Sequence, residues 1–509
     1  MFQLGQDTLT SDILFDLSLI KSPKLQVSED AWARLEKYRA IVMEKANSKE
    51  KIYGLNTGFG FLSNVSIDKE KLEQLQYNLV RSHACGVGDP VDAQIARACL
   101  ILRAHTFLMG YSGISRAAVE QILTFISHDI LPVIPAQGSV GASGDLAPLA
   151  HLAMGLMGEG EVHFEGKLQD ADKVLKDLKI EPLKLGPKEG LSLINGTHFM
   201  SAIAAVAVKR AKVAMQSADV ATALSLDAIR GSLAAFDERI QNIRPQVSQA
   251  TVAKNIRNIY AAKDSEIMGS HVGCDKVQDP YSFRCVPQVH GACRDTLIHC
   301  EQVVNRELNA VTDNPLVFED GSIISGGNFH GEPIAMVMDF LAIAVAEIGS
   351  ISERRIEKIT NPNLSGLPAF VIKDSGLNSG FMIPHVVAAA LVSENKVLSH
   401  PASVDSIPTS ADKEDHVSMG PIAARKCLKI LDNTFNILSI EFLTAIQGID
   451  LLEPLKTASP LEAVRSAIRA VAPRLDCDRS LHKEIKTISQ WIEDGKILIA
   501  LKQNDVTIH

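Results

Sequence analysis

The tripeptide Ala142-Ser143-Gly144 has the residue types needed for covalent chemistry on its own backbone. If a tight turn presses the amide nitrogen of Gly144 onto the carbonyl carbon of Ala142, the nitrogen can attack that carbon, because glycine is unhindered and conformationally permissive. Loss of two waters then leaves a five-membered ring that carries the former Ser143 as an exocyclic methylidene. The sequence therefore contains the parts of an electrophile that is made from the chain itself.

The same stretch also has a purely structural interpretation. Glycine, serine and aspartate before an apolar run, with Pro148 near its start, are typical of a loop that leads into a helix. Ser143 or Asp145 would then cap that helix. Because short motifs often match by chance, the rest of the chain has to decide between the two interpretations.

Other polar loops are candidates for a site. Tyr53 and Asn56 lie in a glycine-rich stretch at 53–60, which is typical either of a binding loop or of a plain surface connection. His83 falls near the end of a helical segment, where a single histidine is more often structural. Helix N-termini favour anions, so several of them at one pocket would surround it with hydrogen-bond donors. Four further polar loops lie beside long helical segments, at 193–197, 277–284, 325–332 and 412–419.

The elements that must position these loops are mainly helical. Segments 196–229, 331–360 and 418–452 exceed the usual length of a globular helix and predict a bundle of long helices. An amphipathic helix begins after Ser28. Shorter helical patterns occupy 72–80, 93–109, 117–130 and 146–157.

Strand patterns are confined to two short hairpins, at 162–168 and 316–324. The predicted fold class is therefore mainly α, a long-helix bundle with a few short hairpins. No repeat, low-complexity segment or linker separates the chain into independent domains. We expect one catalytic unit, with residues 1–195 carrying the Ala-Ser-Gly loop and residues 196–509 forming the long-helix region.

The composition excludes several classes of protein. Of the 509 residues, 46% are hydrophobic and 22% are charged, which is ordinary for a globular protein and too apolar for a disordered one. The net charge is −9 and basic residues form no block, so the sequence predicts no nucleic-acid partner. The N-terminus lacks the pattern of a secretory signal, and the apolar runs at 202–208 and 340–346 are shorter than a membrane span. We therefore expect a cytoplasmic protein with no membrane partner.

The cysteines and histidines show no metal-binding pattern. The eight cysteines include no Cys-x-x-Cys pair, which favours reduced thiols over disulfides or a zinc site. The fifteen histidines include no His-x-x-x-His or His-Glu-x-x-His spacing. We expect no metal.

Taken together, the motifs resemble those of the aromatic amino acid ammonia-lyase family. Ten stretches match in order along nearly the whole chain: YGLNTGFG, SHACGVG, GSVGASGDLAPLAHLA, SLINGT, KVQDPYSFRC, ELNAVTDNPLVF, SGGNFHGEP, GLNSGFM, SVDSIPTSA and EDHVSM. The resemblance implies the ammonia-lyase and fumarase type of helical fold. It also implies that Ala142, Ser143 and Gly144 form 4-methylidene-imidazol-5-one (MIO), with no external cofactor. The family is homotetrameric, with active sites that combine loops from more than one subunit.

The resemblance also implies roles for single residues. Tyr53 would be the general base that removes the β-proton of an amino acid, and Tyr281 would assist close to the MIO ring. Asn195 would hydrogen-bond the ring or the substrate amine. Arg284 would bind the substrate carboxylate, since a guanidinium group can bind both oxygens at once. The pocket would also be lined by Gln278 and Phe329.

His83 and Glu414 match the positions that meet an imidazole in the histidine branch of the family. A carboxylate that accepts a ring N–H is sensible there, because a buried ring nitrogen without a partner is costly. The resemblance therefore implies elimination of ammonia from L-histidine to give trans-urocanate. Two alternatives stay open: a phenylalanine or tyrosine ammonia-lyase or aminomutase, and an inactive helical scaffold.

The sequence departs from the family pattern in two places. Asp412-Lys413 stands where the family usually has Asn-Gln, and Lys413 precedes Glu414 directly. Pro384-His385 replaces a pair that usually contains glutamine. These departures bear on substrate preference and rate rather than on the Ala-Ser-Gly chemistry.

Overall fold

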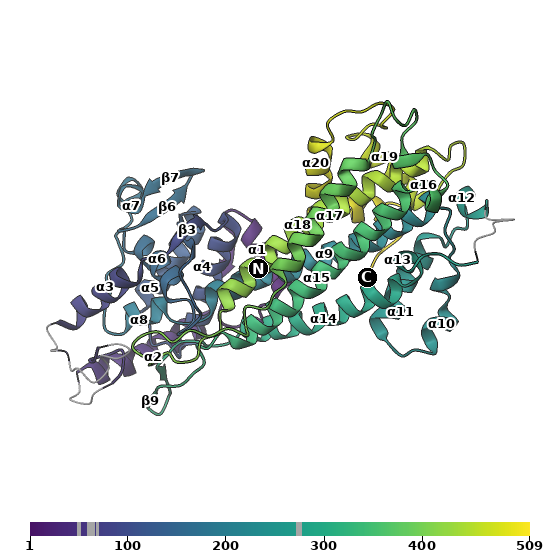
Figure 1. The fold of residues 1–509 in the computed structure, drawn as a ribbon. Helices are drawn as coiled ribbons and strands as arrows, with labels where there is room; N and C mark the ends of the chain where they lie inside the picture. Colours follow the sequence, from purple (N-terminus) through teal and green to yellow (C-terminus); the bar gives the residue numbers. More distant parts are fainter. Residues whose placement is uncertain (48–51, 59–66, 68–70, 271–276) are drawn as a thin grey trace. The chain divides into compact units, whose positions relative to one another are not determined.

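The computed structural model describes residues 1–47, 52–58, 67, 71–270 and 277–509, and it is mainly helical, as the sequence predicts (Figure 1). Within these described ranges, four helices exceed twenty residues: α9 (His198–Ala228), α14 (Val286–Glu307), α15 (Glu332–Thr360) and α18 (Gly420–Asp450). Three of them confirm the predicted long segments. α14 was not predicted; Gly291 weakens the helical pattern in its second turn, whereas Pro287 stands in the first turn, where a proline is tolerated.

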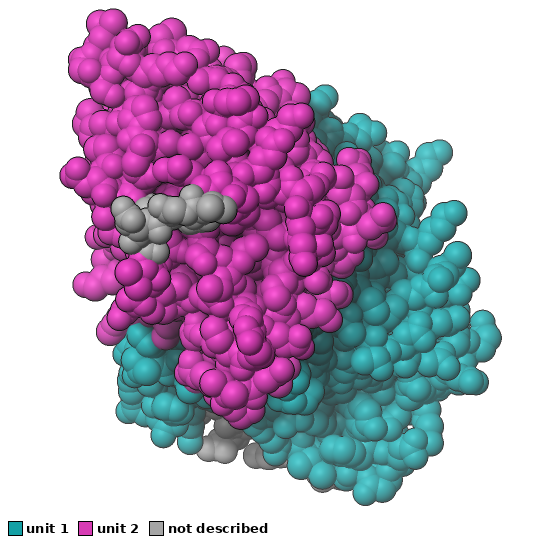
Figure 2. Space-filling model, turned by 90° about the vertical axis from the view of Figure 1, so that its right-hand side faces the viewer, with its two compact units in different colours: residues 1–209, 301–339, 401–425 teal, residues 210–300, 340–400, 426–509 magenta. Residues whose placement is uncertain are grey.

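The chain divides into two compact units (Figure 2). The first unit comprises residues 1–209, 301–339 and 401–425, and the second comprises 210–300, 340–400 and 426–509. The first unit thus continues past residue 195 and takes in two later stretches. The division at 195/196 that we expected from sequence does not coincide with these limits and stays a prediction.

The first unit is built from short and medium helices around the buried helix α4 (Ala93–Phe107). In α2 (Glu29–Ala46), the Ser28 hydroxyl accepts the N–H of Ala31 at 3.2 Å and caps the helix. One face of α2 is buried, as its helical spacing predicts. The other helices are α1 (Ser11–Leu19), α3 (Leu72–His83), α5 (Arg116–His128), α6 (Leu146–Leu156), α7 (Ala171–Leu178) and α8 (Glu189–Ile194).

The strands are short and lie in the first unit. Both predicted hairpins are confirmed: β6 (Glu161–Phe164) pairs with β7 (Lys167–Asp170), and β8 (Leu316–Val317) pairs with β9 (Ile323–Ile324), each antiparallel. The prediction that strands occur only in hairpins was wrong. β1 (Phe2–Gln3) pairs in parallel with β2 (Leu25–Gln26), β3 (Val87–Pro90) pairs with β5 (Pro135–Gln137), and β4 (Leu131–Pro132) adds to β6. Such short strands are too brief to show alternation, and their partners are distant in sequence.

The second unit contains most of each of the four long helices. The remaining end of each of these helices belongs to the first unit. A buried carboxylate, Glu441 of α18, accepts from the Ser225 hydroxyl of α9 at 2.8 Å and forms an ion pair with Arg355 of α15. These contacts place α9, α15 and α18 against one another (Figure 1). The remaining α-helices are α10 (Glu238–Asn242), α11 (Val247–Ile259), α12 (Glu266–Gly269), α13 (Tyr281–Arg284), α16 (Pro362–Ser365), α17 (Met382–Leu398), α19 (Ser459–Arg469), α20 (His482–Glu493) and α21 (Lys496–Lys502). The described part of this unit also contains two 3₁₀ turns, η3 (Ala234–Phe236) and η4 (Ala369–Val371).

By length and composition alone, helix α15 is long and apolar enough to cross a membrane. Its uninterrupted apolar run at 340–346 is shorter than a membrane span. Of its most apolar stretch, 67% is buried inside the protein. That burial is typical of a core helix in a folded domain, which passes the same test of length and composition.

Candidate active site

Ala142 and Ser143 lie on the wall of a cavity of about 410 Å³ in the first unit. The cavity brings together three other residues that the sequence singled out as site residues, Tyr53, Phe329 and Glu414. The remaining lining residues are Asn314, Ser325, His330, Lys413, Asp415 and His416. Segments from four distant parts of the sequence therefore meet at the Ala-Ser-Gly loop.

The backbone of the loop is held by the turn between α8 and α9. The N–H of Gly196 donates to the carbonyl oxygen of Ser143 at 3.2 Å, and the N–H of Asp145 donates to the carbonyl oxygen of Gly196 at 2.8 Å. Gly144 has φ +71°, and a Cβ at that position would lie 2.1 Å from the carbonyl oxygen of Gly196. Only glycine fits there, so the residue that must supply the attacking nitrogen is also the one that the fold requires.

A second segment holds the loop from its N-terminal side. The Ser418 hydroxyl donates to the carbonyl oxygen of Gly141 at 3.1 Å, and the N–H of Met419 donates to the carbonyl oxygen of Val140 at 2.8 Å. Ala142 packs in an apolar cluster with Met419. The loop is therefore clamped between two chain segments, as a backbone reaction in a tight turn requires.

The structural interpretation of the loop as a helix cap differs from what the structure shows. Asp145 occupies the N-cap position of α6, but neither its side chain nor that of Ser143 caps that helix. The carboxylate of Asp145 instead accepts the N–H of Met200 at 2.9 Å, in the first turn of α9. Burial raises the pKa of Asp145 to about 7. The helix N-terminus that Asp145 satisfies is therefore that of the neighbouring long helix.

Asn195 ends helix α8 and lies beside the loop. Its side-chain nitrogen donates to the carbonyl oxygen of Asn314, a cavity residue, at 3.5 Å. Its side-chain oxygen is buried and has no hydrogen-bond partner among the described residues. An unsatisfied buried acceptor costs free energy, so this oxygen is suited to receive a donor that enters the site.

Glu414 is fixed at the cavity by a short backbone pairing. Its backbone pairs with that of Thr409 in both directions, and its carboxylate accepts the Thr409 hydroxyl at 2.6 Å. His330 and His416 stack at the same wall, with ring centroids 5.8 Å apart and an interplanar angle of 13°. The cavity lining thus includes the half-buried carboxylate of Glu414, the exposed carboxylate of Asp415 and two imidazoles, together with the loop.

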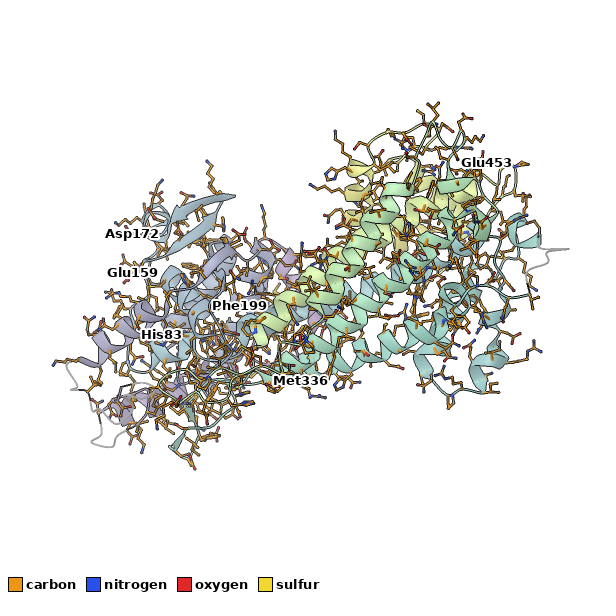
Figure 3. All side chains as sticks on the ribbon, viewed as in Figure 1. His83, Glu159, Asp172, Phe199, Met336 and Glu453 are labelled. Atoms are coloured by element: carbon orange, nitrogen blue, oxygen red, sulfur yellow. The ribbon has the colours of Figure 1, made fainter. Side chains whose placement is uncertain are left out.

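His83 does not line the cavity. It is the last residue of α3 (Figure 3), and its Nδ1 lies 2.8 Å from the carbonyl oxygen of Leu79. The C-terminal turn of its own helix therefore holds the ring. The predicted role of His83 toward an imidazole stays a prediction.

Gln278, Tyr281 and Arg284 lie in the second unit, on and beside α13. The Arg284 guanidinium lies 4.5 Å from the centre of the Tyr281 ring, and the Tyr281 side chain is 70% exposed. Asp279 anchors this segment by accepting the N–H of Ser232 at 2.7 Å. The three predicted residues are thus presented together on one short segment.

The two departures from the family pattern have different surroundings. Lys413 lies at the cavity beside Glu414, so it adds a cation to the site. His385 lies in α17 of the second unit, where its Nε2 contacts the carboxylate of Glu353 at 2.8 Å. Although burial alone would raise the pKa of Glu353, its bonds to His385 and Arg354 lower it.

The described residues contain no group of three or more His, Cys, Asp or Glu side chains arranged to hold a metal ion. Seven cysteines in the described ranges are free thiols, and four of these are buried. Cys274 lies outside the described residues, as do Phe59 and Gly60 of the predicted glycine-rich loop.

The residues at the loop fit an MIO group. The close approach of Gly144 to Gly196, and of Gly141 to Ser418, leaves no room for larger side chains. Ser143, which would become the methylidene, is half-buried and faces the cavity. Asn195, whose side-chain oxygen has no partner among the described residues, directly precedes Gly196, whose N–H binds the Ser143 carbonyl oxygen.

Several residues of the cavity wall were not predicted individually from the sequence. Asn314, Ser325, His330 and His416 all lie in stretches whose motifs were recognised, but no local signal separates them from their neighbours. Arg103 of the buried helix α4 was also missed, although it donates to the carbonyl oxygen of Asn195 at 2.8 Å. An arginine that directly follows the apolar run at 99–102 is the signal that could have found it.

Comparisons with known proteins agree with these observations. A sequence profile described as aromatic amino acid lyase matches residues 9–470. The chain is 48% identical to histidine ammonia-lyase of Myxococcus xanthus over 479 residues, which covers 94% of each chain. The crystal structure of histidine ammonia-lyase from Trypanosoma cruzi has a TM-score of 0.91 at 45% identity and covers 99% of this chain and 95% of its own. Tyrosine aminomutase from Streptomyces globisporus has a TM-score of 0.93 at 36% identity over the whole of both chains. The chain belongs to the aromatic amino acid lyase family.

Proposed function

We propose that the protein is a histidine ammonia-lyase, which eliminates ammonia from L-histidine to give trans-urocanate. Near-full-length relatives with this name, from a bacterium and from a trypanosome, support the activity at 48% and 45% identity. The observation that carries the proposal is one cavity that joins the Ala-Ser-Gly loop, Tyr53 and Glu414. Those residues supply an electrophile, a base and an acceptor for a ring N–H.

The proposed cofactor is MIO, formed from Ala142, Ser143 and Gly144. When formed, MIO supplies an electrophile that activates a poor leaving group. The two-sided clamp on the loop and the glycine-only geometry at Gly144 support this assignment. No external cofactor is required.

The chain's own residues divide the remaining tasks. Tyr53 removes the β-proton, and the side-chain oxygen of Asn195 accepts a hydrogen bond from the substrate amine. Glu414 accepts the N–H of the imidazole, with its carboxylate oriented by the Thr409 hydroxyl at 2.6 Å. Phe329 packs against the ring from the cavity wall. His83 is assigned to the imidazole by resemblance.

Gln278, Tyr281 and Arg284 act in the site of another copy of the chain. We base this on the homotetramer with shared active sites that is typical of the family. The 70% exposed Tyr281 and its neighbour Arg284 are then available to a partner subunit, where Arg284 binds the substrate carboxylate. Gln278, exposed on the same segment, lines that pocket. We place the assembled enzyme in the cytoplasm.

Tyrosine aminomutase activity is the second candidate. It is favoured by the full-length similarity to tyrosine aminomutase from Streptomyces globisporus, at a TM-score of 0.93. An aminomutase pocket for tyrosine needs to match a phenol, whereas this cavity carries Lys413, Glu414 and two histidines. The charged wall fits an imidazole better than a phenol ring.

A substrate panel separates these functions. The purified protein is incubated separately with L-histidine, L-phenylalanine and L-tyrosine, and the near-ultraviolet absorbance of the unsaturated product is followed, with amino acid analysis for β-amino products. We expect product from histidine alone. Preferential turnover of tyrosine, with or without a β-amino product, would contradict the proposal.

A further inference from the structure

Arg103 is a fully buried cation that binds backbone carbonyls instead of a carboxylate. Its guanidinium donates to the carbonyl oxygens of Ser192 and Asn195, the latter at 2.8 Å. Lys188, another fully buried cation of the first unit, pairs with Asp313 at 2.9 Å. Within the part of the chain that the structure describes, no carboxylate forms such an ion pair with Arg103. Burial lowers the pKa of Arg103 to about 10, so the side chain keeps its charge at neutral pH.

The surroundings of Arg103 hold the guanidinium in one orientation. The Phe107 ring lies 4.3 Å from its central carbon, and the Nδ1 of His198 accepts from the same nitrogen that binds Asn195, at 2.9 Å. Burial keeps the pKa of His198 well below its usual value, so its ring is neutral and able to accept. The charges of Asp313 and Asp145 favour the cation without bonding to it, so the hydrogen bonds of this buried guanidinium go to backbone carbonyls and to His198, which indicates a positioning function.

The charge of Arg103 reaches Ser143 through one peptide group. The carbonyl of Asn195 and the N–H of Gly196 belong to the same amide, so a cation at the carbonyl makes that N–H a stronger donor. The N–H of Gly196 donates to the carbonyl oxygen of Ser143 at 3.2 Å. Arg103 therefore stabilises negative charge on the Ser143 carbonyl oxygen through two hydrogen bonds and the peptide group between them.

We propose that Arg103 is a positioning residue for the conversion of Ser143, which fixes and polarises the Asn195–Gly196 peptide so that it stabilises negative charge on the Ser143 carbonyl oxygen. The inference rests on the proposed function, because it requires that residues 142–144 cyclise. It assigns a role to a side chain that does not line the cavity.

The chemistry needs negative charge on that oxygen at one step. In ring closure, a bond forms between the Gly144 nitrogen and the Ala142 carbonyl carbon, and the Ala142 oxygen leaves as water with the N–H protons of Ser143 and Gly144. In the second dehydration, the Cα proton of Ser143 is removed and the electron pair delocalises onto the Ser143 carbonyl oxygen. The pair then forms the Cα–Cβ double bond as the hydroxyl leaves Cβ, and the hydroxyl and the proton depart as water. No external reagent is consumed.

The test follows the mass of the chain after cell-free synthesis in wild type, Arg103→Met, Arg103→Lys and the matched control Lys188→Met. Peptide fragmentation of the folded fraction reports whether Ser143 keeps its hydroxyl. We expect wild type and Lys188→Met to become two waters lighter at similar rates. Arg103→Met is expected to lose the Ser143 hydroxyl about tenfold more slowly or worse, because it removes support for an oxyanion donor. Arg103→Lys keeps the charge and is expected to recover part of the rate.

Three results would overturn the inference. Arg103→Met could become two waters lighter as fast as wild type, Lys188→Met could be slowed as much as Arg103→Met, or Arg103→Lys could be no faster than Arg103→Met. The Lys188→Met result matters because it also removes a buried cation, so an equal effect would show that modification follows stability alone. If the wild-type chain itself keeps its full mass, the proposed function fails instead. The two failures are therefore distinguishable.

Discussion

Asp227 makes the stability of the second unit depend on pH in a direction that can be measured. The carboxyl group is buried in α9, where it accepts a hydrogen bond from the Thr457 hydroxyl. Burial raises the pKa of Asp227 from 3.8 to about 7. Because the pKa rises on folding, the folded protein holds a proton that the unfolded chain releases between these two values. The stabilising contribution is therefore complete below about pH 4 and is lost as the pH rises through 7.

The size of the effect follows from the shift. The pKa moves by about three units, and each unit corresponds to about 1.4 kcal/mol, so the free energy of unfolding falls by about 4 kcal/mol over this range. Asp227→Asn cannot ionise and keeps an oxygen for the Thr457 hydroxyl. We expect the variant to match wild type at about pH 4 and to exceed its free energy of unfolding by up to about 4 kcal/mol at about pH 8.

The assay is urea unfolding, followed by circular dichroism at about pH 4, 6 and 8. Asp219→Asn is the control, because Asp219 is buried in the same unit but contacts Arg294 at 2.6 Å and His290 at 2.7 Å. Although burial alone would raise the pKa of Asp219, these partners lower it, so its contribution is lost only in acid. Asp219→Asn should therefore destabilise the protein at about pH 8. A difference between Asp227→Asn and wild type that is negative at about pH 8, or the same at every pH, would refute the reasoning.

Three further predictions concern the candidate site. Gly144→Ala places a Cβ 2.1 Å from the Gly196 carbonyl oxygen, so intact mass should show an unmodified chain, and a chain two waters lighter would refute the geometric argument. Tyr53→Phe should lower kcat for histidine by about 10² or more while the mass stays that of the modified chain, and unchanged kcat would remove Tyr53 as the base. Glu414→Gln should lower kcat/KM for histidine by about tenfold or more while the chain stays two waters lighter, since it weakens only the acceptor for the ring N–H, and an unchanged kcat/KM would speak against imidazole recognition.

Local patterns predicted much of the helical fold. α2 begins after Ser28 and buries one face as its spacing requires, and α9, α15 and α18 follow the predicted long segments within a few residues at each end. These elements are predictable because their signal lies within one stretch of chain. The pairings of β1 with β2 and of β3 with β5 were not predictable, since they depend on where the tertiary fold brings short segments.

In the candidate site, too, residues with a local motif were predictable, whereas contacts between distant segments were not. Motifs identified Ser143, Tyr53, Phe329 and Glu414, and the structure places all four at one cavity. The partners that hold the loop were not visible, because the bond from Gly196 to Ser143 and the cap of α9 by Asp145 join segments about fifty residues apart. The capping pattern before α6 pointed to the wrong helix, since a sequence shows that a cap is present but not which N-terminus lies closest.

The central claim is that Ala142-Ser143-Gly144 supplies the electrophile for elimination of ammonia from histidine. The most direct measurement compares urocanate formation by wild type and by Ser143→Ala, with intact mass recorded on the same samples. We expect an active wild-type chain that is two waters lighter than its sequence, and a folded Ser143→Ala chain whose turnover is lower by several orders of magnitude. Equal activity in the two proteins, or an active wild-type chain at its full sequence mass, would contradict the claim.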